Sequence, residues 1–374
     1  MRDLSFGLEL RDFVISPKDN NDGSGRRKTR KKGKTTNNYL SVINGYITKY
    51  NQTYQTKNPL PPVPKVKVSP REEKEDTSLS RNEIESIIQF DPKEKKGRVN
   101  QIGRDKLLTA KHLFLFQYYC LGMRIADTLL LRTKNFSELG IKYQMKKTGT
   151  QMTIPPDYTI GHQLKHFFPD LYNQSIEETK LGDLEFTGNE MLDFILKMKF
   201  DGVRISKMTL PDLTQFISDF KNQDYGVIQH ITFLEQTRER MATMVCSKMF
   251  NHIRNQKERF IFPFLQMKDF SGLQYNSLSN LTELQNYKLH RARVLYNKWL
   301  SVLAEEIGIG ISMTGHSARH TFSNILHFSE GTPEEISLAL GHKNLSTTMK
   351  YLKRFPSHIR QSGIDKFRRS NPSF

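Results

Sequence analysis

Cysteine is scarce in this sequence. The 374 residues include two cysteines, Cys120 and Cys246, which lie far apart and lack the Cys/His spacing of a zinc site. This scarcity excludes a disulfide-rich secreted scaffold and fits a reducing cytoplasm, in which thiols stay free. We expect both cysteines to be small buried apolar residues, and we expect no bound metal.

Long apolar segments are missing as well. No stretch is hydrophobic over the length that a membrane-spanning helix needs, and the N-terminus has no secretory signal pattern. Hydrophobic residues make up 36% of the chain, which is low for a compact globule. We therefore expect a cytoplasmic protein with no membrane partner, whose polar faces bind another molecule.

Acidic residues are outnumbered. The chain has 57 Lys and Arg against 39 Asp and Glu, which gives a formal net charge of +18 and a pI near 9.7. Such a balance favours a polyanionic partner, with nucleic acid ahead of an anionic membrane surface. The strongest concentration of charge is a run of seven basic residues: Arg26, Arg27, Lys28, Arg30, Lys31, Lys32 and Lys34. Two interpretations stay open for this run, a solvated loop and an arm that follows DNA phosphates.

The C-terminal segment 314–355 is predicted to form three short helices joined by tight turns. His316, Arg319 and His320 have the spacing i, i+3, i+4, so one face of the first helix presents all three. Gly331 is predicted to end that helix. The second helix should begin at Thr332-Pro333, with Glu335 completing a capping box.

The same segment continues with a third helix. Gly341 should end the second helix, which places His342 directly after the helix end. Ser346 can cap the next helix, which carries Tyr351. Cationic side chains and helix ends that converge on one place favour a bound phosphate. A tyrosine beside that place is a candidate nucleophile, because its ionisation at pH 7 costs about 4 kcal/mol, much of which nearby cations can offset.

These residues resemble the C-terminal signature of the tyrosine recombinase (phage integrase) family. The family pattern is His-x-x-Arg, then Leu-Gly-His, then Tyr nine residues later, and here these are His316, Arg319, His342 and Tyr351. The resemblance implies that Tyr351 attacks the scissile phosphate, while His316 assists proton movement. It implies that arginines and His342 stabilise the non-bridging oxygens and that no nucleotide cofactor is needed.

Two further motifs of that family can be found upstream. A glycine break at Leu121-Gly122-Met123 precedes Arg124, which resembles the first arginine of the family, with Asp127 as its supporting acidic residue. Residues 141–154 are predicted to form a β-hairpin. Lys147, just before Thr148-Gly149, resembles the hairpin lysine that protonates the leaving 5′ oxygen, and Lys146 is the alternative.

The predicted organisation has two domains. Residues 1–60 should form a small helical DNA-binding domain, smaller than the four or more helices usual in the family, with one amphipathic helix that Thr35-Thr36 caps and Asn58-Pro59 ends. A proline- and charge-rich linker, 61–77, precedes a catalytic domain, 78–374. We expect an insertion within 173–257, helices at 190–200, 232–250 and 286–307, and a basic tail at 356–374.

The predicted fold class is therefore mainly α, with a small β-hairpin or sheet, as in integrases. The predicted function is a site-specific recombinase of mobile DNA that acts without metal or ATP, associates with the nucleoid, and forms a tetramer on paired sites in double-stranded DNA but a monomer or dimer off DNA. Two alternatives stay open: a type IB topoisomerase-like relaxing enzyme, and a non-catalytic DNA-binding protein on the same fold.

Overall fold

The computed structural model describes residues 33–54, 59, 61–64, 78–92, 101–185, 205–222, 228–273, 280–329 and 331–352. The chain divides into two compact units, Met1–Glu75 and Asp76–Phe374, which we describe separately. Among the residues that the structure describes, no helix is long and apolar enough to cross a membrane. The assignment of DNA-binding and catalytic roles to two domains stays a prediction.

The first unit contains helix α2 (Gly33–Tyr54). Leu40 is buried, and the side-chain amide of Asn44 accepts a hydrogen bond from the backbone N–H of Val63 and donates one to its carbonyl. One detail of the predicted helix is wrong. It begins before Thr35-Thr36, so these residues lie inside the helix and do not cap it. The predicted stop at Asn58-Pro59 follows residues 55–58, which lie outside the described residues.

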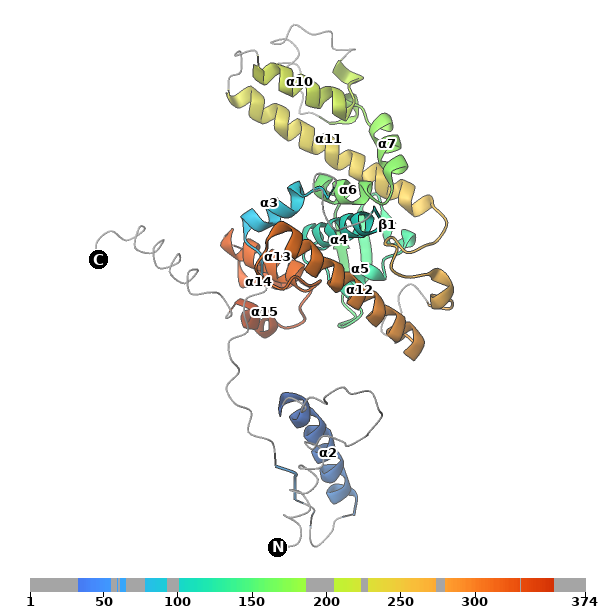
Figure 1. Cartoon of the computed structure of the whole chain (residues 1–374), viewed down its shortest axis with the longest axis vertical. Coiled ribbons are helices and arrows are strands. Elements are labelled where there is room, and N and C mark those ends of the chain that lie inside the picture. Colours follow the sequence, from blue (N-terminus) through green and yellow to red (C-terminus); the bar gives the residue numbers. More distant parts are fainter. Residues whose placement is uncertain are drawn as a thin grey trace, which may run out of the picture. The chain divides into compact units, whose positions relative to one another are not determined.

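The second unit is mainly helical (Figure 1). Its elements in chain order are α3 (Arg81–Gln89), α4 (Gln101–Tyr119), α5 (Ile125–Leu129), η1 (Thr133–Asn135), β1 (Phe136–Ser137), β2 (Gly140–Gln144), β3 (Gln151–Ile154), α6 (Tyr158–Lys165), α7 (Pro169–Glu178), η2 (Leu181–Asp183), α10 (Leu210–Asn222), α11 (Ile228–Asn255), η3 (Met267–Phe270), α12 (Glu283–Ile307), α13 (Ser317–Phe328), α14 (Pro333–Ala339) and α15 (Leu345–Leu352). The mainly α class with a small sheet is confirmed.

Helix α4 is the centre of the main hydrophobic core. Most of its apolar side chains, including Phe114 and Phe116, are fully buried, and the helix packs against α6, α12 and α13. Burial of two such aromatic residues contributes several kcal/mol, at about 25 cal/mol per Å² of apolar surface. The helix that carries Arg319 therefore packs directly on the helix at the centre of the main core.

The three strands form an antiparallel sheet in the order β1-β2-β3. Ile141 pairs with Ile154 at one end of the β2–β3 hairpin, and Gln144 pairs with Gln151 at the other. The predicted hairpin 141–154 is confirmed. Its second strand covers 151–154 as expected, whereas the first, expected to reach Lys147, ends at Gln144. Lys146 and Lys147 lie in the turn, so strict alternation between two faces does not apply to them.

A smaller hydrophobic cluster lies along the first part of α11. Helix α10 runs alongside this part of α11 (Figure 1). Leu213, Ile217 and Phe220 of α10 pack there with Leu234 and Met241 of α11. The later part of α11 packs against α6, α7 and β1, so this one helix belongs to both clusters. The predicted helix 232–250 lies within α11, whereas the predicted helix 190–200 lies outside the described residues.

Helix α12 confirms the predicted helix 286–307. Its amphipathic pattern predicts a core face of Val294, Leu295, Trp299, Leu300 and Leu303. Leu300 and Leu303 are buried, whereas Val294 and Leu295 are 56% and 46% exposed. This predicted face was too wide, because α12 contacts the core along one narrow side. Its opposite side carries apolar residues in contact with solvent.

A group of imidazoles lies where α4 packs on α6. The ring of His112 stacks on that of His166, with centroids 4.6 Å apart. His112 Nδ1 donates to Gln163 Oε1 at 3.0 Å, since the amide nitrogen of Gln163 is used on the Thr159 carbonyl. Burial is the main reason why the pKa of His112 falls to about 4; the hydrogen bond to Gln163 opposes the shift, and the neighbouring His166, Lys111 and His162 add to it.

Acid should therefore destabilise the fold through His112. Its pKa is lower in the folded state, so the unfolded chain binds more protons between about pH 6.5 and 4, and stability falls as pH falls through this window. The loss for this one group is on the order of 3 kcal/mol. Chemical denaturation of wild type and His112→Gln from pH 7 to 4 measures it. The variant should lose less stability, and parallel curves for the two proteins would contradict the prediction.

Candidate active site

The three C-terminal helices have the predicted turns. His316 is the N-cap residue of α13, and Thr332 caps α14 in a capping box with Glu335. Gly341, at a φ of +60°, turns the chain after α14 and leads to His342. The cap of α15 differs from the prediction, because the carboxamide of Asn344, and not the hydroxyl of Ser346, accepts from a first-turn N–H. Tyr351 belongs to α15, and its side chain lies outside the described residues.

Arg319 is the most deeply buried cation of the site. Its side chain is 1% exposed, and its guanidinium donates to the carbonyl oxygens of Gly122 at 3.0 Å and Leu340 at 2.6 Å. Nη2 also lies 3.0 Å from His342 Nε2. One side chain of α13 thus links the turn before α5 to the turn after α14.

The hydrogen bonds of His342 define its tautomer. A guanidinium has only donors, so Nε2 must accept from Arg319, and Nδ1 carries the proton that it donates to Thr348 Oγ1 at 2.8 Å. Burial is the main reason why the pKa of His342 falls to about 4. The positive charges of Arg319, Arg124 and Lys147 lower it further, so this imidazole is neutral at pH 7.

His316 shares these cationic neighbours. Burial lowers its pKa, followed by the charges of Arg319, Arg124, Arg293 and Lys147. Its ring meets that of His320 edge to face, with centroids 5.6 Å apart. Part of the His316 side chain is nevertheless open to solvent. A neutral, accessible imidazole is suited to accept a proton.

Gly122 brings the Arg124 segment against α13. Its φ is +63°, and a Cβ at this position would lie 3.0 Å from Arg319 Cα. Two residues later, Arg124 is the N-cap residue of α5 and is half-buried. Its Nη1 donates to the sulfur of Met145, the last residue before the hairpin turn, at 3.0 Å.

Asp127 holds the hairpin turn through a buried hydrogen bond. It is 1% exposed, and its Oδ1 accepts from the backbone N–H of Lys146 at 2.8 Å. Burial raises the pKa of this carboxyl to about 6, although the Lys146 N–H and the charge of Arg124 oppose the shift. Asp127 therefore lies against the hairpin and supports the backbone of its turn.

The two hairpin lysines have different surroundings. The ammonium of Lys146 donates to Asn286 Oδ1 of α12 at 3.1 Å, whereas the Lys147 side chain is exposed. The charge of Lys147 acts on both His316 and His342. Five of the predicted residues are thus close enough to interact electrostatically: Arg124, Lys147, His316, Arg319 and His342.

Several residues of this neighbourhood escaped the sequence analysis. Thr348 holds the ring of His342, Met145 contacts Arg124, and Arg293 acts on His316. Arg293 and Asn286 are both on the long helix α12, whose amphipathic pattern indicated only packing. No signal in the sequence separated these residues from ordinary surface and core positions.

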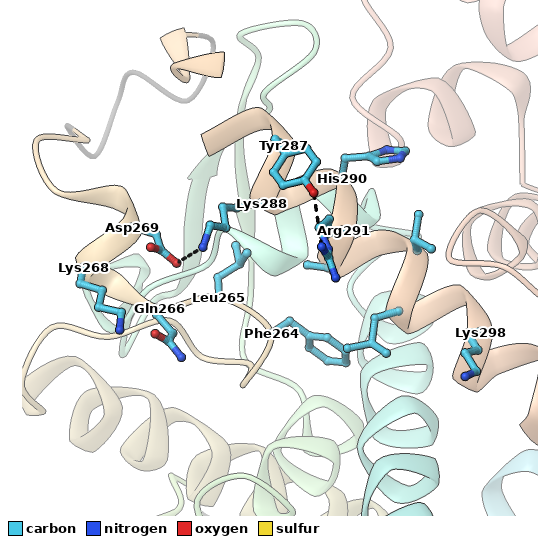
Figure 2. Close-up of a pocket in the computed structure, with 13 residues that line it drawn as sticks. Phe264, Leu265, Gln266, Lys268, Asp269, Tyr287, Lys288, His290, Arg291 and Lys298 are labelled. Atoms are coloured by element: carbon cyan, nitrogen blue, oxygen red, sulfur yellow. Dashed lines mark hydrogen bonds and ion pairs between the residues drawn. The ribbon is translucent and has the colours of Figure 1, made fainter. Parts of the chain in front are cut away.

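Other predicted DNA contacts cannot be located. Residues 26–32 lie outside the described residues, and Lys34 lies in α2 without a described side chain. A pocket of about 790 Å³ lies between α12 and the loop at 264–269, and it contains none of the predicted site residues (Figure 2). In it, Arg291 donates to the Tyr287 hydroxyl at 3.3 Å, and Lys288 pairs with Asp269 at 3.3 Å.

The arrangement of α12 to α15 can be compared with known families. Residues 281–358 match the model of the phage integrase family. The resemblance inferred from the signature is therefore confirmed for this segment. The matched segment includes His316, Arg319, His342 and Tyr351, whereas Arg124 and Lys147 lie before it. No curated protein matches the chain.

Arg319 should matter for stability as well as for chemistry. Arg319→Met removes the donor for two carbonyl groups in a buried position, which should lower the free energy of unfolding by about 2–4 kcal/mol. Arg124→Met is the matched control, because Arg124 is half-buried and donates to a thioether, and its cost should be about 1 kcal/mol or less. Urea denaturation measures both variants. Equal losses would show that Arg319 has no special structural role.

Proposed function

We propose that this chain is a site-specific DNA recombinase, which cuts and rejoins DNA strands through a covalent bond between Tyr351 and the 3′ phosphate. The observation that carries the proposal is the convergence of three cations, Arg124, Lys147 and Arg319, on two neutral histidines. A DNA phosphate is the anion that such a concentration of positive charge favours. The match of the same C-terminal segment to the phage integrase family supports it.

The proposed cleavage step exchanges one phosphoester for another. The Tyr351 oxygen forms a bond to phosphorus, the bond from phosphorus to the 5′ oxygen breaks, and the electron pair stays on that oxygen. Lys147 supplies the proton that makes it a 5′-hydroxyl, and His316 accepts the proton of the tyrosine. The 5′-hydroxyl of another strand reverses the step. The energy of the phosphodiester is kept in the protein–DNA bond, so ATP is not needed.

The arginines have the second role in this mechanism. Arg124 and Arg319 stabilise the charge on the non-bridging oxygens as phosphorus becomes five-coordinate. Both ring nitrogens of His342 have protein partners, Arg319 and Thr348. A contact between His342 and the phosphate therefore requires the exchange of one partner, and otherwise His342 acts by orienting Arg319. In the second route Arg319 keeps its hydrogen bonds and acts on the phosphate through its positive charge.

The remaining parts of the chain fit the same proposal. The basic run 26–34 follows the phosphates of double-stranded DNA, and four protomers assemble on two paired sites. The substrate to test first is the DNA that flanks the gene, searched for inverted repeats.

Tyr351→Phe tests the nucleophile. On a flanking-DNA duplex nicked next to the cleavage position, the wild type should accumulate a covalent adduct, seen on a denaturing gel. The variant should form none while its DNA affinity stays within about twofold, because only the attacking oxygen is lost. Tyr287→Phe, an exposed tyrosine of α12, is the matched control and should keep the adduct.

An adduct that persists in Tyr351→Phe would refute the assignment. Tyr296 could not easily replace it, because this phenol is 0% exposed and donates to Gln117 Oε1 at 2.9 Å. Relaxation of supercoiled plasmid without sequence preference would favour a topoisomerase instead. DNA binding without any adduct in the wild type would favour a non-catalytic protein.

Lys147→Ala tests the leaving-group acid. Without the ammonium the 5′ oxygen must leave unprotonated, so cleavage should slow by about two to four decades. Replacing that bridging oxygen by sulfur removes the need for a proton, since a thiolate leaves unaided. The variant should then cleave the sulfur-containing DNA at nearly the wild-type rate, in EDTA as well as in magnesium. Single-turnover rates on the two substrates provide the measurement.

Lys146→Ala is the control in this experiment. Its ammonium is held by Asn286, so its loss should give no sulfur-dependent rescue. Rescue of Lys146→Ala alone would assign the acid to Lys146. A Lys147→Ala variant with weakened affinity and no rescue would mean that Lys147 only contacts the DNA backbone.

A further inference from the structure

Met145 lies at the base of the turn that carries Lys147. Its backbone N–H donates to Thr150 at 2.9 Å and its carbonyl accepts from Gly149 at 2.8 Å, so it closes the turn from both sides. Its side chain is 1% exposed and points into the interior, away from the exposed lysine. The hairpin turn therefore has a buried anchor directly beside the candidate active site.

The sulfur is the atom of the Met145 side chain that accepts hydrogen bonds. It lies 3.0 Å from Arg124 Nη1 and 3.4 Å from the hydroxyl of Thr148, and both groups donate to it. A thioether is a weak acceptor without charge. It therefore gives the Arg124 guanidinium a buried partner while leaving its full positive charge available. A carboxylate here would neutralise that charge, and a leucine would leave the N–H without this acceptor.

The other contact of Met145 is with the turn before His342. A Cβ built on Gly341 would lie 2.5 Å from Met145 Cε and 2.9 Å from its sulfur. Met152 on β3 packs against the same glycine, with its sulfur 2.8 Å from that Cβ position. The backbone at Gly341 thus rests on the side chain that also contacts Arg124.

We propose that Met145 is a positioning residue of the site, whose thioether fixes Arg124 relative to the Lys147 turn and to the Gly341–His342 turn. The three groups come from separate parts of the chain, and this one side chain contacts all three. The proposal rests on the proposed function for its effect on cleavage. Its geometric part, the orientation of Arg124, can be measured without any reaction on DNA.

Met145→Leu is the variant that isolates the sulfur. It conserves the side-chain volume, a change that cores usually tolerate, and it removes the acceptor of Arg124. Met152→Leu is the matched control, because it makes the same change against Gly341. We expect both variants to fold with wild-type circular dichroism and thermal midpoints within about 5 °C of wild type.

The first readout is cleavage of two substrates, an ordinary phosphate and a methylphosphonate that lacks one negative oxygen at the cleaved position. Met145→Leu should cut the ordinary phosphate about 10- to 100-fold more slowly than wild type, with DNA affinity within about threefold. On the methylphosphonate the difference in rate between Met145→Leu and wild type should be smaller, because this substrate has one negative oxygen fewer for Arg124 to stabilise. Met152→Leu should stay within about threefold of wild type on both substrates.

The second readout is the reaction of Arg124 with phenylglyoxal, followed by peptide mass spectrometry in the absence of DNA. Arg124 should be modified several-fold faster in Met145→Leu than in wild type or Met152→Leu. Equal modification in all three proteins, or a cleavage defect that is the same on both substrates, would overturn the proposal. If the wild type forms no covalent adduct, the proposed function fails, and the phenylglyoxal arm still decides whether Met145 orients Arg124.

Discussion

The guanidinium of Arg319 joins two turns that are distant in sequence, through the carbonyl oxygens of Gly122 and Leu340. Removing a charge from water costs several kcal/mol unless hydrogen bonds replace the lost hydration. Here the two carbonyls and the ring of His342 replace it. The three-helix segment and the Arg124 segment therefore share this buried cation as a hydrogen-bonded link. Structure and proposed chemistry use the same side chain.

The concentration of positive charge affects the protonation of the two histidines of the site. Burial is the main cause of the lowered pKa of His316 and His342, and the charges of Arg319, Arg124 and Lys147 add to it, so both rings are neutral at pH 7. Asp127 supplies negative charge from beneath, but burial raises its own pKa to about 6. A phosphate would relieve the mutual repulsion of the cations. In this state the site is a concentration of positive charge prepared for an anion.

Local signals in the sequence predicted much of this arrangement. Thr332 and Glu335 form the expected capping box, and Gly122 and Gly341 break helices where glycine was read as a breaker. Each of these features depends on a few residues close together in the chain, so it can be predicted from the sequence alone. The tertiary contacts are different. Met145 looked like an ordinary strand residue, and only the fold brings its sulfur to Arg124. Likewise, whether Val294 faces the core depends on where other helices lie.

Helix α11 has a consequence for how the second unit is held together. Leu234 and Met241 belong to the small cluster with α10, while Met249 and Ile253 farther along belong to the main core. Both clusters therefore need side chains of this shared helix. At about 1.5 Å per residue, α11 is about 40 Å long. Deleting α10 would leave apolar side chains of α11 in water and invite aggregation. The α10 region thus has its own cluster but shares helix α11 with the main core, so it could not be excised as a separate module.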